Sequence, residues 1–264
     1  NLSSFKLMTY EMVFIRHQFE RAQVEAHIDS IFPCSKELGY RNRAQFKTDG
    51  ERLGFVGYRS RVLVDVEDCL VLNSGCRQTL QKLRSQLPNL KWKPTKEFVW
   101  NFIDIDDEVV AEEIHLNQRL RFRQGNSEQN QKMKEWLKQQ LADLNFKSAL
   151  ELFCGDGNFT ETLVELGLRK ILAMESNFSS IQGLGQKNFA GVEAKKIDLF
   201  KDPPFGLLKK LDADILLLDP PRTGFPFLRN WVHKLNYLKK IVYISCSTPT
   251  LLKDISPLMR NGWR

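Results

Sequence analysis

A single cysteine, Cys246, follows a short apolar run that is typical of a buried strand. The stretch IVYISCSTPT covers residues 241–250, and it changes from β-branched and aromatic residues to small polar ones at the thiol. A lone cysteine is most often a small residue of the core. At a strand end between Ser245 and Ser247, however, a thiolate could be a nucleophile that adds to an electron-poor ring carbon. The neighbouring ring carbon could then take a methyl group.

Two glycines and a glutamate follow the ends of two other apolar runs. Gly155 and Gly157 come directly after SALELF (148–153), where they allow the backbone to turn tightly and to approach a ligand. Glu175 ends the next apolar run, about 20 residues later, which is the spacing at which an acidic side chain can bind two ribose hydroxyls. Alternatively, Glu175 caps the helix that follows.

The glycine pattern lacks the third glycine of dinucleotide-binding folds, and Asn158 is followed by the bulky Phe159. A ligand with a ribose but without a pyrophosphate therefore fits better than a dinucleotide. S-adenosylmethionine is such a ligand.

Asp219 and Arg222 lie in LLLDPPRTG (216–224), at the end of a further apolar run. The two prolines have no backbone N–H and stiffen the loop, which would hold the Asp219 carboxylate at the strand tip, where it can bond a polar group. A purely structural turn is the alternative. Methyltransferases that act on exocyclic amines often carry an aromatic residue after two prolines, so Arg222 disfavours amine chemistry.

These residues follow runs that alternate with helix-length amphipathic stretches. The runs lie at 148–153, 170–174, 193–197, 213–219 and 239–245, and helices are expected after Asn158, over 177–189, in a short segment before 213 and near 226–237. Strands buried on both faces and separated by helices indicate a parallel, doubly wound, Rossmann-like α/β sheet. Ligands of such sheets bind beyond the carboxyl ends of the strands, so the side chains named above should lie close together.

Residues 1 to about 117 have a different pattern, typical of a smaller β-rich α+β domain. A helix is expected over 9–29, antiparallel hairpins over 40–66 around the turn signals Asp49-Gly50 and Gly57, and a second helix over 76–87. EFVWNFIDI (97–105) and EEIHL (112–116) are expected to be strands, and the acidic run over 104–113 a solvated edge. We therefore predict domains over 1–117 and 118–264.

The chain of 264 residues has a net charge of +7. Such a surplus fits a polyanionic partner, but it is also common in proteins that bind none. Much of it lies in residues 36–61, where three acids accompany seven cations: Lys36, Arg41, Arg43, Lys47, Arg52, Arg59 and Arg61. This local excess favours a surface that faces phosphates.

Five cysteines at irregular spacing form no Cys-x-x-Cys pair and no His-Cys cluster. The sequence therefore predicts neither a disulfide framework nor a zinc site. No window approaches the roughly 18 apolar residues that a membrane span needs. We expect a soluble protein of the reducing cytoplasm, with no membrane contact and no obligate protein partner.

Four stretches occur in the order and spacing of the RNA 5-methyluridine (uracil-C5) methyltransferases, which act on transfer RNA and 23S ribosomal RNA: FRQGNSEQNQ, LFCGDGNFT, LDPPRTG and YISCSTPTLLKD. The resemblance is specific over residues 120–260. YEMVFIRHQFERAQVE and LGYRNRAQFKT are similar, more loosely, to that family's amino-terminal and central segments. The resemblance implies a class I methyltransferase domain and a central β-rich domain that helps to hold RNA.

The resemblance also implies the chemistry. Cys246 would attack C6 of a flipped uracil, C5 would take the methyl group of S-adenosylmethionine, and a base would remove the C5 proton so that the thiol can leave. Asp219 and Arg222 would border the target base. Residues implied to line the cofactor are Gln124, Phe153, Gly155, Asn158, Glu175 and Asp219, with Asp198 near its adenine. Expected RNA contacts are Arg41, Arg43 and Lys47, with Tyr40 or Phe46 stacking on a base unless they belong to the core.

The sequence departs from the family pattern in three places. Ser247 and Thr248 follow the thiol where members have Asn-Pro, so a side-chain amide near the target is lost. Members with an iron–sulfur cluster have three closely spaced cysteines before the segment matched by KLMTYE. Here only Cys69 stands where a fourth ligand could be, so we expect no cluster and no metal. The family's general base is a glutamate beyond the last helix, so we expect the sequence, which stops at MRNGWR, to be incomplete and to lack this base.

Two other functions stay open. The chain could methylate another nucleobase position with the second thiol at a strand tip, Cys154. It could also be a non-catalytic RNA-binding or chaperone-like relative that kept the fold while the residues around Cys246 changed.

Overall fold

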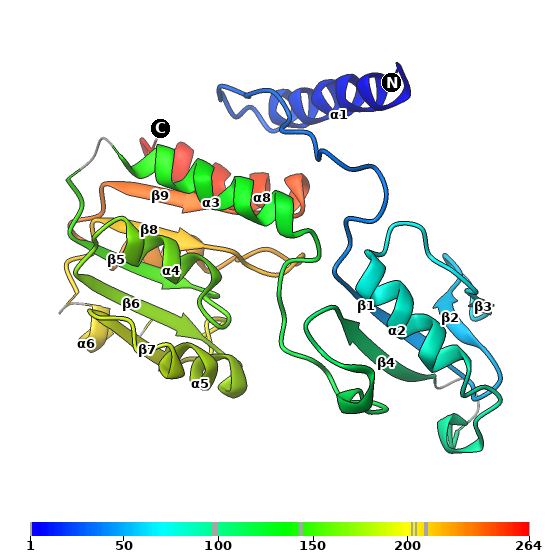
Figure 1. Cartoon of the computed structure of the whole chain (residues 1–264). Helices are drawn as coiled ribbons and strands as arrows, with labels where there is room; N and C mark the ends of the chain where they lie inside the picture. Colours follow the sequence, from blue (N-terminus) through cyan, green and yellow to red (C-terminus); the bar gives the residue numbers. More distant parts are fainter. Residues whose placement is uncertain are drawn as a thin grey trace. The chain divides into compact units, whose positions relative to one another are not determined.

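The computed structural model describes residues 2–96, 100–142, 145–201, 203, 205–208 and 211–263. The chain forms two compact units, one of Pro33–Met133 and one of Asn1–Phe32 with Lys134–Arg264. Each unit has its own sheet and its own core (Figure 1). The domain boundary predicted between residues 117 and 118 stays a prediction.

The larger unit is built on a five-stranded parallel sheet. Its strands are β5 (Ser148–Leu152), β6 (Lys170–Glu175), β7 (Val192–Lys196), β8 (Ile215–Leu218) and β9 (Lys240–Tyr243). They lie in the order β7-β6-β5-β8-β9, and the arrows in Figure 1 point the same way. The chain thus moves outward from β5 in one direction, returns, and moves outward in the other. This doubly wound order confirms the predicted Rossmann-like fold.

Composition explains why these segments are strands. Every residue of β5 and of β8 is buried, and both central strands are continuous apolar runs except for Ser148 and Glu151. Helices connect the strands, as parallel pairing requires. They are α4 (Asn158–Glu165), α5 (Phe178–Gln186), α6 (Phe205–Leu208) and α7 (Leu228–Val232), while α3 (Ser127–Ala142) precedes β5 and α8 (Thr248–Met259) follows β9.

The core of this unit lies against β5, β6 and β8. Leu150, Leu216 and the large side chains of Phe225 and Trp231 are fully buried there. Truncating a buried tryptophan to alanine typically costs about 3–5 kcal/mol. The strand ends are therefore anchored to a well-filled interior.

The smaller unit has a four-stranded antiparallel sheet. Its strands are β1 (Arg43–Thr48), β2 (Leu53–Val56), β3 (Leu63–Asp65) and β4 (Asn101–Asp106), in the order β3-β2-β1-β4. The predicted turn at Asp49-Gly50 is confirmed: the Asp49 carboxylate accepts hydrogen bonds from the backbone N–H groups of Glu51 and Arg52.

Helix α2 (Ser74–Arg84) packs on this sheet. Its Leu80 and Leu83 join a core that includes Phe46 and Ile103. Alternate residues of β1 are buried, which is the expected pattern for a sheet with one covered face. Phe46 is fully buried, so it belongs to the core and is not a platform for a base.

The first helix begins and ends earlier than the expected 9–29. Helix α1 (Leu2–Arg21) ends before Gln23, which has a left-handed φ of +54°. The N–H of Val24 then donates to the carbonyl oxygen of Phe19, which closes the helix end as in a Schellman motif. The amphipathic pattern continues past this residue, and so the sequence placed the end of the helix too late.

Two further predictions for the first 117 residues were wrong, one of them only in part. The segment 112–116 is not a strand: Ala111–Glu113 form a 3-10 turn, and Ile114 packs on the core of the smaller unit. The acidic run is a solvated edge only in part: Asp104 and Asp106 are 96% buried on β4, whereas the four later acids, Asp107, Glu108, Glu112 and Glu113, are exposed. Of the predicted strand at 97–105, residues 97–99 lie outside the described residues, Trp100 precedes β4, and residues 101–105 belong to β4.

Candidate active site

The parallel register places four strand ends level with one another. Leu152 lies opposite Met174 on one side and Leu218 on the other, and Leu218 lies opposite Tyr243. Phe153, Asp219 and the loop that carries Cys246 follow these positions and leave the sheet at the same edge. Glu175 is the last residue of β6 at this edge.

Cys246 lies on the bend between β9 and α8, and it is exposed. The N–H of Ile244 still donates to the carbonyl oxygen of Leu218 at 2.9 Å, so the loop leaves the sheet only two residues before the thiol. Ser247 is held within the loop: its N–H donates to the Ser245 hydroxyl at 3.1 Å, and its carbonyl oxygen accepts from Thr250 at 3.0 Å. The thiol is therefore presented to solvent by a short, internally bonded turn.

The loop after β5 turns through left-handed backbone conformations. Phe153, Gly155 and Gly157 have φ values of +61°, +55° and +92°. A Cβ on Gly155 would meet no atom within 4 Å, whereas one on Gly157 would lie 2.5 Å from Cδ1 of Leu184. Gly157 is thus needed so that α4 can begin close to α5, while the backbone of Gly155 stays open to a ligand. Asn158, half-buried, is the first residue of α4.

Glu175 links the end of β6 to the glycine loop. Its Oε1 accepts from the N–H groups of Ser176 and Asn177 at 2.6 and 2.8 Å. Its Oε2 faces the N–H of Gly155 at 3.4 Å. The capping alternative is thus partly observed, because the carboxylate orders the turn that leads into α5. A contact with a ribose stays a prediction.

Asp219 is half-buried directly after β8, and burial raises the pKa of its carboxyl group to about 6. Arg222 in the same loop is exposed. Asp198 is exposed beyond β7, where its Oδ1 accepts from the N–H of Phe200 at 3.1 Å. The structure therefore places these three predicted side chains in loops that follow β7 and β8.

An aromatic cluster that the sequence did not predict surrounds Phe153. Its ring meets those of Phe225 and Phe200 edge to face, with centroids 5.1 and 5.9 Å apart. Phe225 is fully buried, whereas Phe200 is 41% exposed. The three rings come from segments after β5, β7 and β8, so their juxtaposition follows from the strand order and not from sequence spacing.

Glu151 is a second feature that sequence reasoning missed. It stands in the middle of an apolar strand, is 98% buried, and its Oε2 accepts from the Thr160 hydroxyl at 2.6 Å. Burial raises the pKa of this carboxyl group to about 8, although Thr160 opposes the shift, and the negative charge of Asp219 raises it further. A lone acid in an otherwise apolar strand was the available signal.

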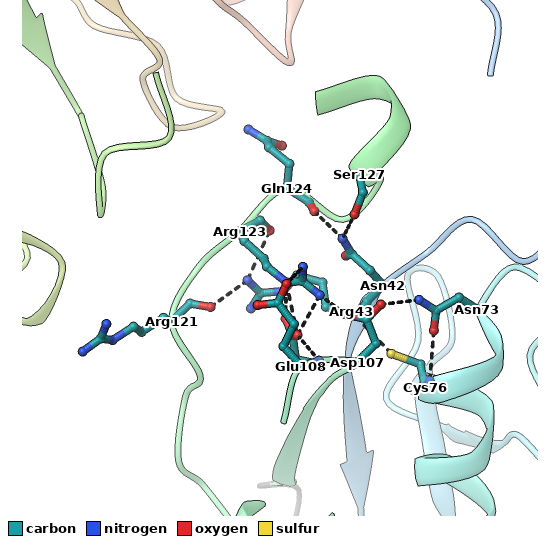
Figure 2. A network of polar contacts seen from close by, with 11 residues as sticks. Asn42, Arg43, Asn73, Cys76, Asp107, Glu108, Arg121, Arg123, Gln124 and Ser127 are labelled. Atoms are coloured by element: carbon teal, nitrogen blue, oxygen red, sulfur yellow. Dashed lines mark hydrogen bonds and ion pairs between the residues drawn. The ribbon is translucent and has the colours of Figure 1, made fainter. Parts of the chain in front are cut away.

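In the smaller unit, Gln124 and Arg43 belong to one polar network, which Figure 2 shows. The side-chain amide of Asn42 donates to the carbonyl oxygen of Gln124 at 3.0 Å and to the Ser127 hydroxyl at 2.8 Å. The Arg43 guanidinium donates to the carbonyl oxygens of Arg121 and Arg123 at 3.0 and 3.3 Å. Arg43 is thus an anchor for the segment 121–124, and the roles of Gln124 toward the cofactor and of Arg43 toward RNA stay predictions.

The other two expected RNA contacts, Arg41 and Lys47, flank Arg43. Arg41 is exposed, and its Nε donates to the carbonyl oxygen of Arg43 at 3.0 Å. Lys47 is half-buried on the outer face of β1, with its Nζ 5.0 Å from the centroid of the Phe102 ring.

Comparison with known proteins identifies the family. Residues 82–202 match the family model described as tRNA (Uracil-5-)-methyltransferase. An uncharacterized RNA methyltransferase of Nitrosomonas europaea is 44% identical over 255 residues, which cover 96% of this chain and 65% of that protein. A 23S rRNA (uracil(1939)-C(5))-methyltransferase of Marinomonas posidonica is 28% identical over 311 residues, covering 95% of this chain and 68% of that protein. The chain belongs to the RNA uracil-C5 methyltransferase family.

The chain spans about two thirds of the length of these two relatives. Among solved structures, an O-methyltransferase of Thermotoga maritima described as SAM-dependent aligns with a TM-score of 0.40 and 16% identity, over 54% of this chain and 52% of that chain. The strand order alone identifies the fold, and this partial likeness is no further evidence for it.

Within the described residues, no group of three or more histidine, cysteine or acidic side chains is placed so that it could hold a metal ion. None of the described helices is long and apolar enough to cross a bilayer.

We predict that Glu151→Gln changes how stability depends on pH. Because the folded-state pKa is raised, the folded protein keeps a proton that the unfolded chain releases between about pH 4.5 and pH 8, so wild-type stability falls as pH rises through this window. Glutamine does not titrate. The stability of the variant relative to wild type should therefore grow between pH 5 and pH 8, by roughly 1–3 kcal/mol, in urea unfolding curves.

Glu161→Gln is the matched control. Glu161 on α4 accepts from the Lys134 ammonium at 2.6 Å, and this hydrogen bond lowers the pKa of its carboxyl group. The stabilising effect of this hydrogen bond is fully present above the ordinary pKa of about 4.5 and is lost only as pH falls below it. Between pH 5 and pH 8 the curves of wild type and Glu161→Gln should therefore run parallel, and the variant should gain stability relative to wild type only at lower pH. Parallel curves for wild type and Glu151→Gln would contradict the prediction.

Proposed function

We propose that this chain carries the catalytic part of an enzyme that transfers a methyl group from S-adenosylmethionine to C5 of a uridine in 23S rRNA or tRNA, through a covalent bond to Cys246. The observation that carries the proposal is the exposed thiol at the end of β9, at the same edge of the sheet as Glu175 and Asp219. The names of the relatives support the reaction class. Such an enzyme would work in the cytoplasm, where its RNA substrates are.

The loop after β5 fits the cofactor. The open space beside Gly155 leaves its backbone accessible, and the Glu175 carboxylate next to it would accept hydrogen bonds from ribose hydroxyls. Phe153 and Asn158 would line the same place, with Asp198 toward the adenine. When bound, S-adenosylmethionine would supply an electrophilic methyl group. By family resemblance, Gln124 would also contribute to this site.

Cys246 would act as a thiolate on a uracil that has been flipped out of its stack, because a stacked base cannot present C6. The Sγ–C6 bond forms, and the electrons of the C5–C6 double bond move onto the C4 oxygen as an enolate. That electron pair then returns through C5 to bond the methyl carbon, while the methyl–sulfur bond of the donor breaks and S-adenosylhomocysteine would be left. When a base removes the C5 proton, the Sγ–C6 bond breaks and the double bond returns. We assign this base to none of the described residues.

Asp219 and Arg222 would hold the target base. At neutral pH a carboxyl group with a pKa of about 6 is mostly ionised, so Asp219 would accept a hydrogen bond from the uracil N3–H group. The exposed Arg222 guanidinium would lie beside the oxygen on which negative charge develops. These two roles explain why both side chains sit in one stiff loop at the sheet edge.

Cys154 is a poor alternative nucleophile. It is 95% buried, and burial raises the pKa of its thiol far above the ordinary value, with further increases from the negative charges of Glu151 and Glu175. A reaction at another nucleobase position through this thiol is therefore disfavoured. A non-catalytic RNA-binding relative would show RNA binding without turnover.

RNA phosphates would bind on the outer face of the sheet in the smaller unit. Lys47 Nζ and Arg119 Cζ lie 5.0 and 5.7 Å from the centroid of the Phe102 ring. Burial lowers the pKa of Lys47, and the positive charge of Arg119 lowers it further. The two positive charges lie near the same ring and repel each other. A bound phosphate would reduce this repulsion. Phe122, 68% exposed, could stack on a base.

We predict that wild-type protein forms a covalent complex with an RNA stem-loop that carries 5-fluorouridine at the target. The fluorine cannot be removed as the C5 proton is, so the Sγ–C6 bond should persist on a denaturing gel. Cys246→Ala should give no complex and no methyl transfer from labelled donor to RNA that lacks 5-methyluridine. Cys154→Ala is the control and should form the complex. Methylation by Cys246→Ala would refute the proposal.

We predict that the double substitution Lys47→Ala with Arg119→Ala weakens RNA binding. If each cation contacts one phosphate of a single strand, the slope of log affinity against log salt should fall by about 1.4 in a filter-binding titration. Lys91→Ala with Lys93→Ala removes the same charge from another exposed part of this unit and is the control. An equal loss in both variants would mean that net charge, and not this surface, holds the RNA. Arg43→Ala is less informative, because it also removes the anchor of residues 121–124.

A further inference from the structure

Asp254 is a buried carboxylate on α8 that has no part in the steps above. It is 94% buried, and its Oδ2 accepts two hydrogen bonds. One donor is the Tyr243 hydroxyl at 2.8 Å, and the other is the backbone N–H of Phe225. A buried acid is stable only when such partners compensate for its desolvation. The two hydrogen bonds therefore account for a carboxyl group at this buried position.

One donor lies at the end of the strand that leads to Cys246, and the other lies in the loop of Asp219. Tyr243 is the last residue of β9, three positions before Cys246. Phe225 ends the loop that starts at Asp219 and contains Arg222. One carboxylate oxygen thus ties the end of β9, from which the loop of Cys246 leaves, to the loop that would hold the base.

The approach of the second loop to α8 is close. Gly224 has a left-handed φ of +77°, and a Cβ at this position would lie 2.5 Å from Asp254 Oδ2 and 3.1 Å from Cβ of Thr250. A side chain at this position would strain the backbone and displace the Asp254 carboxylate. Burial and the hydrogen bond to Asp254 raise the pKa of Tyr243, so its hydroxyl stays a donor. The close approach at Gly224 and the hydrogen bonds of Asp254 therefore hold the loop of Asp219 and the end of β9 at one junction on α8.

We propose that Asp254 is a positioning residue that sets the place of the Cys246 thiol relative to Asp219 and Arg222. The inference rests on the proposed role of Cys246. A displacement of about 1 Å between reacting groups can slow a reaction by about 100-fold, so a junction that joins these two loops would act on the rate of bond formation. Binding of S-adenosylmethionine, which would depend on the loops after β5 and β6, should not depend on it.

The test compares Asp254→Ala, Asp254→Asn and Tyr243→Phe in the full protein. Single-turnover formation of the 5-fluorouridine complex should slow by about 100-fold in Asp254→Ala and by about 10-fold in Tyr243→Phe. Asp254→Asn keeps an acceptor oxygen, so it should form the complex faster than Asp254→Ala does. The dissociation constants for S-adenosylmethionine and for RNA should stay within about twofold of wild type. Ser256→Ala is the control, because the Ser256 hydroxyl donates to the carbonyl oxygen of Leu252 within the same helix.

Hydrogen exchange separates positioning from a general loss of structure. In Asp254→Ala, the N–H of Phe225 should exchange at least about tenfold faster, while those of β5 and β6 keep the wild-type rate. If Asp254→Ala does not fold, Tyr243→Phe tests the positioning role instead, because it removes only the hydroxyl and keeps the ring. Complex formation at the wild-type rate in Asp254→Ala, despite faster exchange at Phe225, would overturn the proposal.

The proposed function can fail separately. If wild-type protein forms no complex with 5-fluorouridine RNA, the role of Cys246 as nucleophile is wrong. The alkylation rate of Cys246 by iodoacetamide then decides whether the junction holds its loop. It should rise severalfold in Asp254→Ala and in Tyr243→Phe but not in Ser256→Ala, and an unchanged rate in all variants would overturn the positioning role as well.

Discussion

The hydrogen-bond register of β5 with its two neighbours is the constraint on which the candidate site depends. With Leu152 opposite both Met174 and Leu218, the strands end within one residue of one another, and the chain leaves the sheet at one edge. β5 and β8 are buried throughout, and polar residues lie next to both, so a shift by one residue would carry a flanking residue such as Asp219 into the interior of the sheet. The same burial that fixes the fold therefore also fixes which side chains meet.

Electrostatics at this edge follow from the same packing. Glu151 lies within the sheet, where burial and the charge of Asp219 keep its carboxyl group protonated at neutral pH. Asp219 lies at the sheet edge, only half-buried, and ionises at lower pH. Of two nearby acids, the one that faces solvent thus carries the charge, and the one beneath it stays neutral. A single negative charge at the strand tip suits a site that must accept one polar edge of a base.

Much of this edge could be predicted from the sequence, because each strand end is marked by residues that a strand does not favour. Glycines, prolines and isolated charges after apolar runs show where the chain leaves the sheet, and the strand order of a doubly wound fold then brings the ends together. What periodicity cannot show is which distant segments meet. The edge-to-face contacts of Phe153 with Phe200 and Phe225, and the hydrogen bond that the Phe225 N–H donates to Asp254, depend on three-dimensional packing alone. The end of α1 was missed for a different reason, since one left-handed residue, Gln23, stops a helix whose pattern continues.

Local charge in the sequence was the weakest guide, because it does not distinguish cations that hold the fold from cations that face a partner. In the basic segment 36–61, Arg43 bonds backbone carbonyl oxygens and Arg52 pairs with Asp49, so both are used within the smaller unit. Arg119 lies outside the segment, yet it shares the Phe102 ring with Lys47, which pairs with Phe102 across β1 and β4. Strand pairing has thus removed cations from the surface that the sequence suggested and added one from elsewhere. For an RNA-binding surface, the relevant quantity is therefore the charge that remains after internal bonds are satisfied, and that can be counted only in the folded chain.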